Sequence, residues 1–103
     1  MSGSILHISV QELCEQAGIG EQAVRAMVEH GIAMPIAGDV VTDWVFDTRS
    51  AQWLQKATRL QQDFDLEWVA IAMVIDLLRQ RDALLLENRQ LRQRLQRFLD
   101  NEE

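Results

Sequence analysis

The chain has 103 residues, 48% of them hydrophobic and 25% charged, and its formal net charge at pH 7 is −6, so we expect one folded soluble domain over residues 1–103. We find no signal peptide at the start and no apolar run long enough to cross a membrane. The single cysteine, Cys14, excludes an internal disulfide, and together these features predict a cytoplasmic protein.

The first 31 residues have the pattern of a helix-turn-helix. Residues 5–8 form a short apolar run that predicts a small strand. The sequence Ser-Val-Gln-Glu at positions 9–12 is a capping box, which predicts a first helix that ends near Ala17, just before Gly18. A second helix is expected from Glu21 to the glycine at position 31. Two short helices joined by a glycine-containing turn form a helix-turn-helix.

The next segment, residues 32–46, indicates a loose hairpin or wing, because Pro35 and Gly38 separate short apolar pairs. Asp47 is a good N-cap for a third helix, which is expected to end near Asp63. A fourth helix follows after a short break. Helical spacing relates Leu66, Val69, Ala70, Met73 and Leu77, and the apolar surface is widened by Trp68, Ile71, Ala72 and Ile75. This segment is therefore predicted to be buried on most sides.

The last third of the chain carries a seven-residue apolar repeat. Leu77, Leu84 and Leu91 share one heptad position, and Asn88 falls at an a position, where Asn fixes the register of some two-stranded coiled coils. Further leucines widen this stripe, so the helix suits packing against its own domain as well as against a second chain. Both alternatives stay open. The second implies a homodimer whose contacts are Leu77, Leu84, Asn88, Leu91, Leu95 and Phe98.

The predicted fold is therefore mostly α. Residues 1–47 are expected to form the helix-turn-helix with small wing strands, residues 48–78 a helical core, and residues 77–100 a long C-terminal association helix. The fourth helix either bends between residues 76 and 81 or runs directly into the last one. The sequence leaves open whether two such helices would pair parallel, antiparallel or not at all.

Residue types that carry catalysis or bind metals are scattered. His7 lies on the predicted strand and His30 at the end of the second helix, where a structural role suits both. Cys14 follows helical spacing and is best interpreted as a small core residue. One cysteine and two separated histidines have no zinc-binding spacing, and no phosphate-binding loop occurs. We therefore predict no enzyme activity, no catalytic residue, no cofactor and no metal.

Charge argues against DNA binding, which is the usual role of a helix-turn-helix. The second helix, which would read the bases, presents Glu21, Arg25 and Glu29 outward. Residues 1–47 contain seven acidic side chains and one basic one, whereas a DNA-reading domain normally has the opposite balance. No direct DNA binding is therefore expected. Residues 89–97 contain four arginines and no acid, so the rear helix is basic.

The tryptophans suggest a protein interface instead. Trp44 and Trp68 lie within apolar runs and are predicted to be core residues, whereas Trp53 adjoins an inner position of the third helix and is expected at a rim. Trp and Arg are frequent hot-spot types in interfaces. The predicted partner-binding residues are Glu21, Arg25, Glu29, Arg49, Trp53 and Arg59.

The order of elements resembles the MerR-like winged helix-turn-helix domains with a trailing dimerisation helix. WVFD at 44–47, ATRL at 57–60, LEW at 66–68 and LENRQLRQRLQRF at 86–98 are similar to the chaperone-modulator family CbpM. This resemblance implies a non-enzymatic inhibitor that binds the J-domain of a DnaJ-type co-chaperone, CbpA, and blocks its access to a DnaK-type chaperone. Because CbpA also binds DNA, the resemblance is compatible with association of this protein with the nucleoid through that partner. The alternative is a MerR-like DNA-binding transcriptional regulator.

Overall fold

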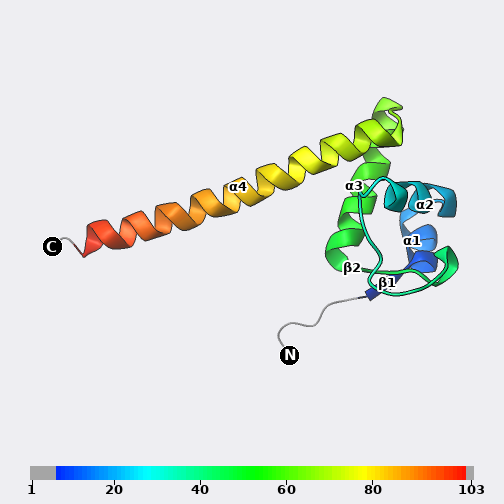
Figure 1. Cartoon of the computed structure of the whole chain (residues 1–103), viewed down its shortest axis with the longest axis horizontal. Helices are drawn as coiled ribbons and strands as arrows, with labels where there is room; N and C mark the ends of the chain where they lie inside the picture. Colours follow the sequence, from blue (N-terminus) through cyan, green and yellow to red (C-terminus); the bar gives the residue numbers. More distant parts are fainter. Residues whose placement is uncertain (1–6, 102–103) are drawn as a thin grey trace.

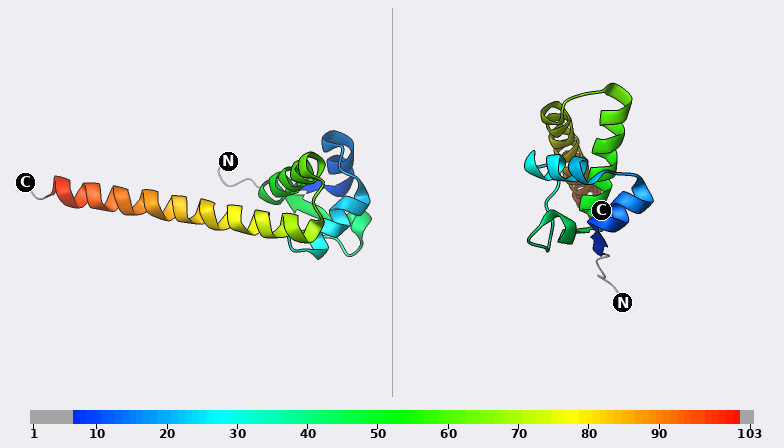
Figure 2. Two further views of the ribbon diagram at one scale, coloured as in Figure 1. Left: turned by 90° about the horizontal axis from the view of Figure 1, so that it is seen from above. Right: turned by 90° about the vertical axis from the view of Figure 1, so that its right-hand side faces the viewer.

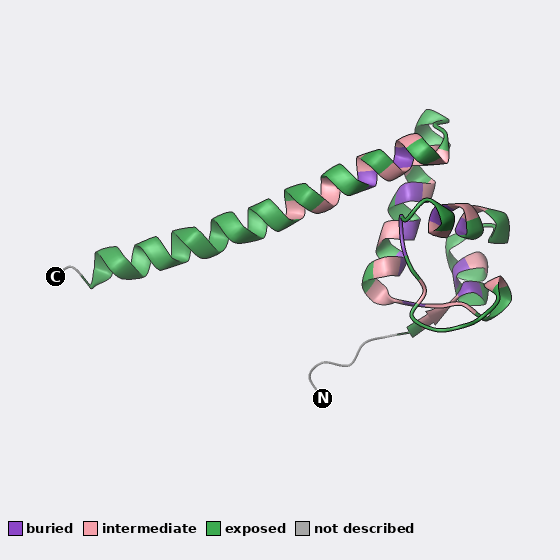
Figure 3. Ribbon diagram, in the orientation of Figure 1, coloured by how far each residue is buried: buried purple, intermediate pink, exposed green. Residues whose placement is uncertain are grey.

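The computed structural model describes residues 7–101. They form a small head of packed helices and one long helix, α4 (Trp68–Asp100), that projects from it (Figure 1). A helix of 33 residues is about 50 Å long. We call residues 83–100 the arm, because every one of them is exposed (Figure 3).

The chain enters the head through β1 (His7–Ser9) and α1 (Val10–Ala17). The predicted capping box is present: Ser9 Oγ accepts a hydrogen bond from the Glu12 amide at 3.1 Å, and the Ser9 amide donates to Glu12 Oε1 at 3.3 Å. Gly18 ends the helix with a φ of 67°, a conformation that glycine adopts at little cost. The first two residues of the predicted strand, at positions 5 and 6, lie outside the described residues.

The second helix, α2 (Glu21–Glu29), begins at the predicted residue and ends two residues before Gly31. The amide of Gly31 donates to the carbonyl of Val28 at 3.0 Å, and Gly31 has a φ of 75°. His30 Nδ1 lies 2.8 Å from the carbonyl oxygen of Ala26, so His30 has the structural role that the sequence predicted for it. These bonds satisfy carbonyl groups that the last turn of a helix leaves free.

The predicted loose hairpin or wing within residues 32–46 is present only as a loop closed by one antiparallel bridge, between Ala37 and Val45. The strand β2 (Val45–Asp47) instead pairs antiparallel with β1, and the residues after position 40 form a short 3₁₀ helix, η1 (Val41–Asp43). Gly38, with a φ of 105°, passes so close to the carbonyl of Asp43 that a Cβ atom would overlap it. Local sequence could not reveal that β1 offers the better partner.

Helix α3 (Thr48–Phe64) begins at the N-cap that the sequence predicted. Asp47 Oδ1 accepts a hydrogen bond from the Ser50 amide at 2.7 Å. The helix ends at Asp65, whose φ of 51° turns the chain into α4. α4 then continues without interruption, so the alternative of a bend between residues 76 and 81 is wrong. Figure 2 shows α4 leaving the head as one long rod.

The prediction that this stretch of the fourth helix is buried on most sides is wrong, because only one side of it is buried. Val69, Met73 and Leu77 are 54%, 66% and 63% exposed, whereas Ile71 and Ile75 are completely buried. Apolar residues surround this stretch of helix, so periodicity alone could not choose the face that packs on α2 and α3. The core comprises Val10, Leu13, Ile19, Val24, Met27, Ile32, Ala33, Phe46, Ala51, Leu54, Ala57, Ile71 and Ile75.

The two tryptophans predicted to be core residues lie at the edge of the core. Trp44 and Trp68 are half-buried and pack against the core, and the ring of Trp44 meets that of Phe46 edge-on at 6.4 Å. Each fully buried large apolar side chain contributes about 1.5–3 kcal/mol, so the thirteen-residue core is what holds the head together. No helix in residues 7–101 is both long and apolar enough to span a membrane.

Candidate protein-interaction surfaces

The outer face of α2 is acidic and fully accessible. Val24 and Met27 point into the core with no exposed surface, which turns Glu21, Arg25 and Glu29 to solvent. These three residues are four apart, so their side chains follow one line along the helix. Glu21 and Arg25 also border a shallow hollow at the start of α2. The predicted arrangement of this helix is confirmed, with one cation between two carboxylates.

Arg59, on α3, is exposed and lies beside the turn between α1 and α2. It lines a groove between α3 and the α1–α2 turn, together with Gln16 and Ile19. The groove and the hollow at Arg25 lie on either side of the same turn. We call the outward residues of α2 the α2 face (Glu21, Arg25 and Glu29), and Arg59 lines the neighbouring groove instead.

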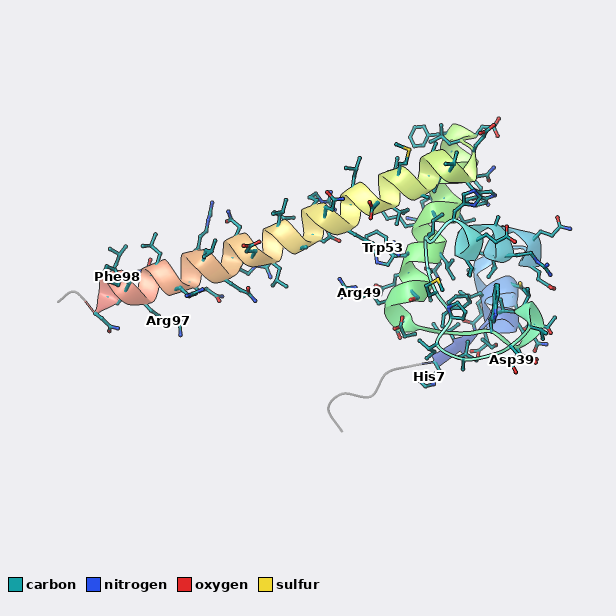
Figure 4. All side chains as sticks on the ribbon, viewed as in Figure 1. His7, Asp39, Arg49, Trp53, Arg97 and Phe98 are labelled. Carbon is teal, nitrogen blue, oxygen red and sulfur yellow. The ribbon has the colours of Figure 1, made fainter. Side chains whose placement is uncertain are left out.

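Arg49 and Trp53 do not belong to the α2 face. They are four residues apart on α3 and point toward the side from which the arm leaves (Figure 4). Arg49 is exposed and Trp53 half-exposed. The six predicted partner-binding residues therefore do not form one surface: three lie on the α2 face, Arg59 lines the groove beside it, and Arg49 and Trp53 face the arm.

Arg79 is a residue that sequence reasoning missed. Its guanidinium carbon lies 5.2 Å from the centroid of the Trp53 ring. Its Nη1 donates to the carbonyl of Gly31 at 3.3 Å, and its Nη2 donates to the carbonyl of Ile32. No sequence signal marked it, because its partners lie 26 to 48 positions away.

The residues of the predicted dimer contact are all exposed in the single chain. Leu84 and Phe98 are 64% and 62% exposed, and Leu91 and Leu95 are similarly open. The head of the same chain does not cover these residues, contrary to the alternative in which this helix packs against its own domain. Large exposed apolar stripes of this kind usually mark an interaction site. We call this set the arm stripe: Leu77, Leu84, Asn88, Leu91, Leu95 and Phe98.

Cys14, predicted to be a small core residue, is only half-buried on α1. Partial burial, followed by the negative charges of Glu21 and Glu15, raises the pKa of the Cys14 thiol above its ordinary value. A raised pKa keeps the thiol protonated and weakly nucleophilic at neutral pH. Within residues 7–101, no three side chains of His, Cys, Asp or Glu gather in a way that would bind a metal ion.

Comparison with known proteins gives the family. Residues 8–93 match the family described as MerR HTH family regulatory protein. A chaperone modulatory protein CbpM from Pseudomonas entomophila is 38% identical over 94 residues, which cover 91% of this chain and 92% of that protein. One from Salmonella paratyphi A is 36% identical over 98% of this chain and 99% of its own length. With the helix-turn-helix and long terminal helix described above, these matches show that the chain belongs to the CbpM family of chaperone modulatory proteins.

Proposed function

We propose that this protein modulates a chaperone system without enzymatic chemistry, by binding the J-domain of a DnaJ-type co-chaperone of the CbpA kind. The relatives bear the name chaperone modulatory protein, which supports the general role. The observation that carries the specific proposal is the α2 face, where a helix that reads DNA in other proteins presents two carboxylates to solvent.

The proposed mechanism is competitive occlusion of the J-domain surface that docks on the chaperone. In J-domains that surface is basic. Glu21 and Glu29 outnumber Arg25 on the α2 face, so this face has the complementary charge. Attraction between the two would raise the association rate, whereas desolvated contacts would set the lifetime of the complex. Arg59 adds a planar donor group at the edge of the groove beside Ile19. Arg49 and Trp53 would form a separate, second contact.

We also propose that the arm stripe pairs with a second copy of this chain. Residues 89–97 carry four arginines without an acid, whereas residues 60–78 carry Asp63, Asp65, Glu67 and Asp76 without a base. Parallel pairing would place the arginine-rich ends together. Antiparallel pairing separates the two arginine-rich ends and brings each one toward Asp76 on the other copy's α4, which Coulomb's law favours.

The test is calorimetry with the purified cognate J-domain, together with a competition assay for chaperone stimulation. Binding that suppresses stimulation supports the proposal, and absence of both effects, while the J-domain alone still stimulates its chaperone, overturns it. Variants of the α2 face and of Arg49 with Trp53 then show which surface binds. We place the complex in the cytoplasm, where the co-chaperone and its chaperone would act.

Because the chain matches a MerR family, DNA binding is the alternative function that must be tested. Fluorescence anisotropy with a mixed-sequence duplex at low salt is the direct measurement. We expect no sub-micromolar binding, because two carboxylates on α2 and Asp39 and Asp43 in the loop repel phosphates. Tight binding that weakens steeply with salt would favour the transcriptional regulator instead.

A further inference from the structure

We infer that Arg79 is a positioning residue, which fixes the direction in which α4 leaves the head. Its half-buried side chain connects three elements. It starts on α4, donates to the carbonyls of Gly31 and Ile32 just beyond the end of α2, and lies over the ring of Trp53 on α3. We call this group of contacts the Arg79 clamp.

The clamp lies at the point where the helix leaves the head. Ile75 is completely buried and Leu78 half-buried, and beyond Asp82 every described residue of α4 is exposed. The apolar contacts before this point hold the helix in place but are not directional. Hydrogen bonds and ring stacking have defined geometry, so the clamp supplies the orientation. From Arg79 to Asp100 the helix extends by about 30 Å, so a small rotation at the clamp displaces its far end considerably.

Arginine suits these partners better than lysine. The carbonyls of Gly31 and Ile32 follow the C-terminal end of α2, where free carbonyl groups and the helix dipole attract a cation. A planar guanidinium can donate to two carbonyls while one of its faces covers an indole ring. The ammonium group of lysine has the same charge, but it is not planar and lacks the paired N–H donors of a guanidinium. It therefore cannot reproduce all three contacts.

The clamp also relates two surfaces to each other. It joins α2, which carries the proposed J-domain contact, to α4, which carries the proposed dimer contact. Arg79 therefore sets the relative position of these surfaces, and through the ring of Trp53 it also adjoins the proposed second contact. This consequence rests on the proposed function, but the clamp itself holds within one chain and can be tested alone.

The experiment measures a distance between the head and the arm in the full-length chain. With Cys14→Ser as background, spin labels are attached at Thr42→Cys in the head and Gln93→Cys on the arm, both exposed positions away from the clamp. Labelled chains are diluted into an excess of unlabelled chains, so that distances arise within one chain. Electron double resonance then reports the distribution of distances for each variant.

We expect one narrow distribution for the parent protein and a broad one for Arg79→Ala. Arg81→Ala is the matched control, because Arg81 lies on the same helix and pairs with Asp82 at 3.1 Å. It should keep the narrow distribution. Circular dichroism checks that each variant retains its helices. If Arg79 only stabilised the fold, Arg79→Ala would lower the melting temperature without broadening the distance distribution.

If Arg79→Ala does not fold, Arg79→Lys provides the test instead. It keeps the charge and most of the volume, so the head should remain folded, and the distribution should still broaden. An unchanged distribution in the folded Arg79 variants overturns the inference, as does a broad distribution in the parent. Failure of the parent protein to bind the J-domain would overturn the proposed function instead and would leave the clamp unaffected.

Discussion

Asp47 Oδ1 accepts the amide hydrogen of Ser50 at 2.7 Å, so the residue that completes β2 also begins α3. This hydrogen bond is the main reason that the pKa of Asp47 lies below its ordinary value. The Ser50 hydroxyl and the charges of Arg49 and His7 lower it further. Because the pKa is lower in the folded chain than in the unfolded one, the ionised carboxylate stabilises the fold.

The first prediction concerns this cap. Asp47→Ala should lower the free energy of unfolding by about 1 kcal/mol at pH 7, as loss of an N-cap usually does. The contribution of Asp47 is complete above the unfolded pKa of about 3.9 and is lost as the pH falls through the lower folded pKa. The difference between the two proteins should therefore shrink below about pH 4. Urea denaturation at several pH values measures it, and an equal difference throughout would contradict the electrostatic explanation.

The second prediction concerns Gly38. Gly38→Ala should destabilise the protein by about 2 kcal/mol or more, because a φ of 105° is costly for alanine and its Cβ would overlap the Asp43 carbonyl. Gly20→Ala is the control, since Gly20 has an ordinary φ of −72° and open space around it. Thermal unfolding compares the two. A similar shift in both variants would show that the close approach of the loop is not what requires glycine.

The third prediction concerns association through the arm. Leu91→Asp should yield monomers, because it places a charge in the middle of the arm stripe. Leu86→Asp introduces the same charge on the opposite side of the same exposed helix and should leave the mass unchanged. Light scattering at about 100 µM is suitable, since pairs of micromolar affinity are then associated. A monomeric parent protein at that concentration would exclude the dimer.

The fourth prediction concerns the α2 face. Glu21→Lys with Glu29→Lys should slow association with the J-domain and flatten its salt dependence, each change costing about 1 kcal/mol or less at a solvated rim. Glu87→Lys with Asp100→Lys changes the net charge equally but lies on the arm. Stopped-flow association rates at several salt concentrations distinguish a local effect from a general one. If both pairs act alike, net charge rather than the α2 face governs the encounter.

Elements that depend on neighbours a few positions away were predictable from the sequence. The capping box at residues 9–12, the glycine that ends α1 and the N-cap at Asp47 each act through hydrogen bonds that close within three or four residues. The same holds for the outward side chains of α2, because helical spacing alone separates Glu21 and Glu29 from Val24 and Met27.

Only the tertiary structure decided features that depend on distant parts of the chain. The pairing of β2 with β1, the burial of Ile71 and Ile75 in place of Val69 and Met73, and the contact of Arg79 with Gly31 all join residues far apart in sequence. Packing against the rest of the head selected one apolar face of α4 where the helical period allowed several.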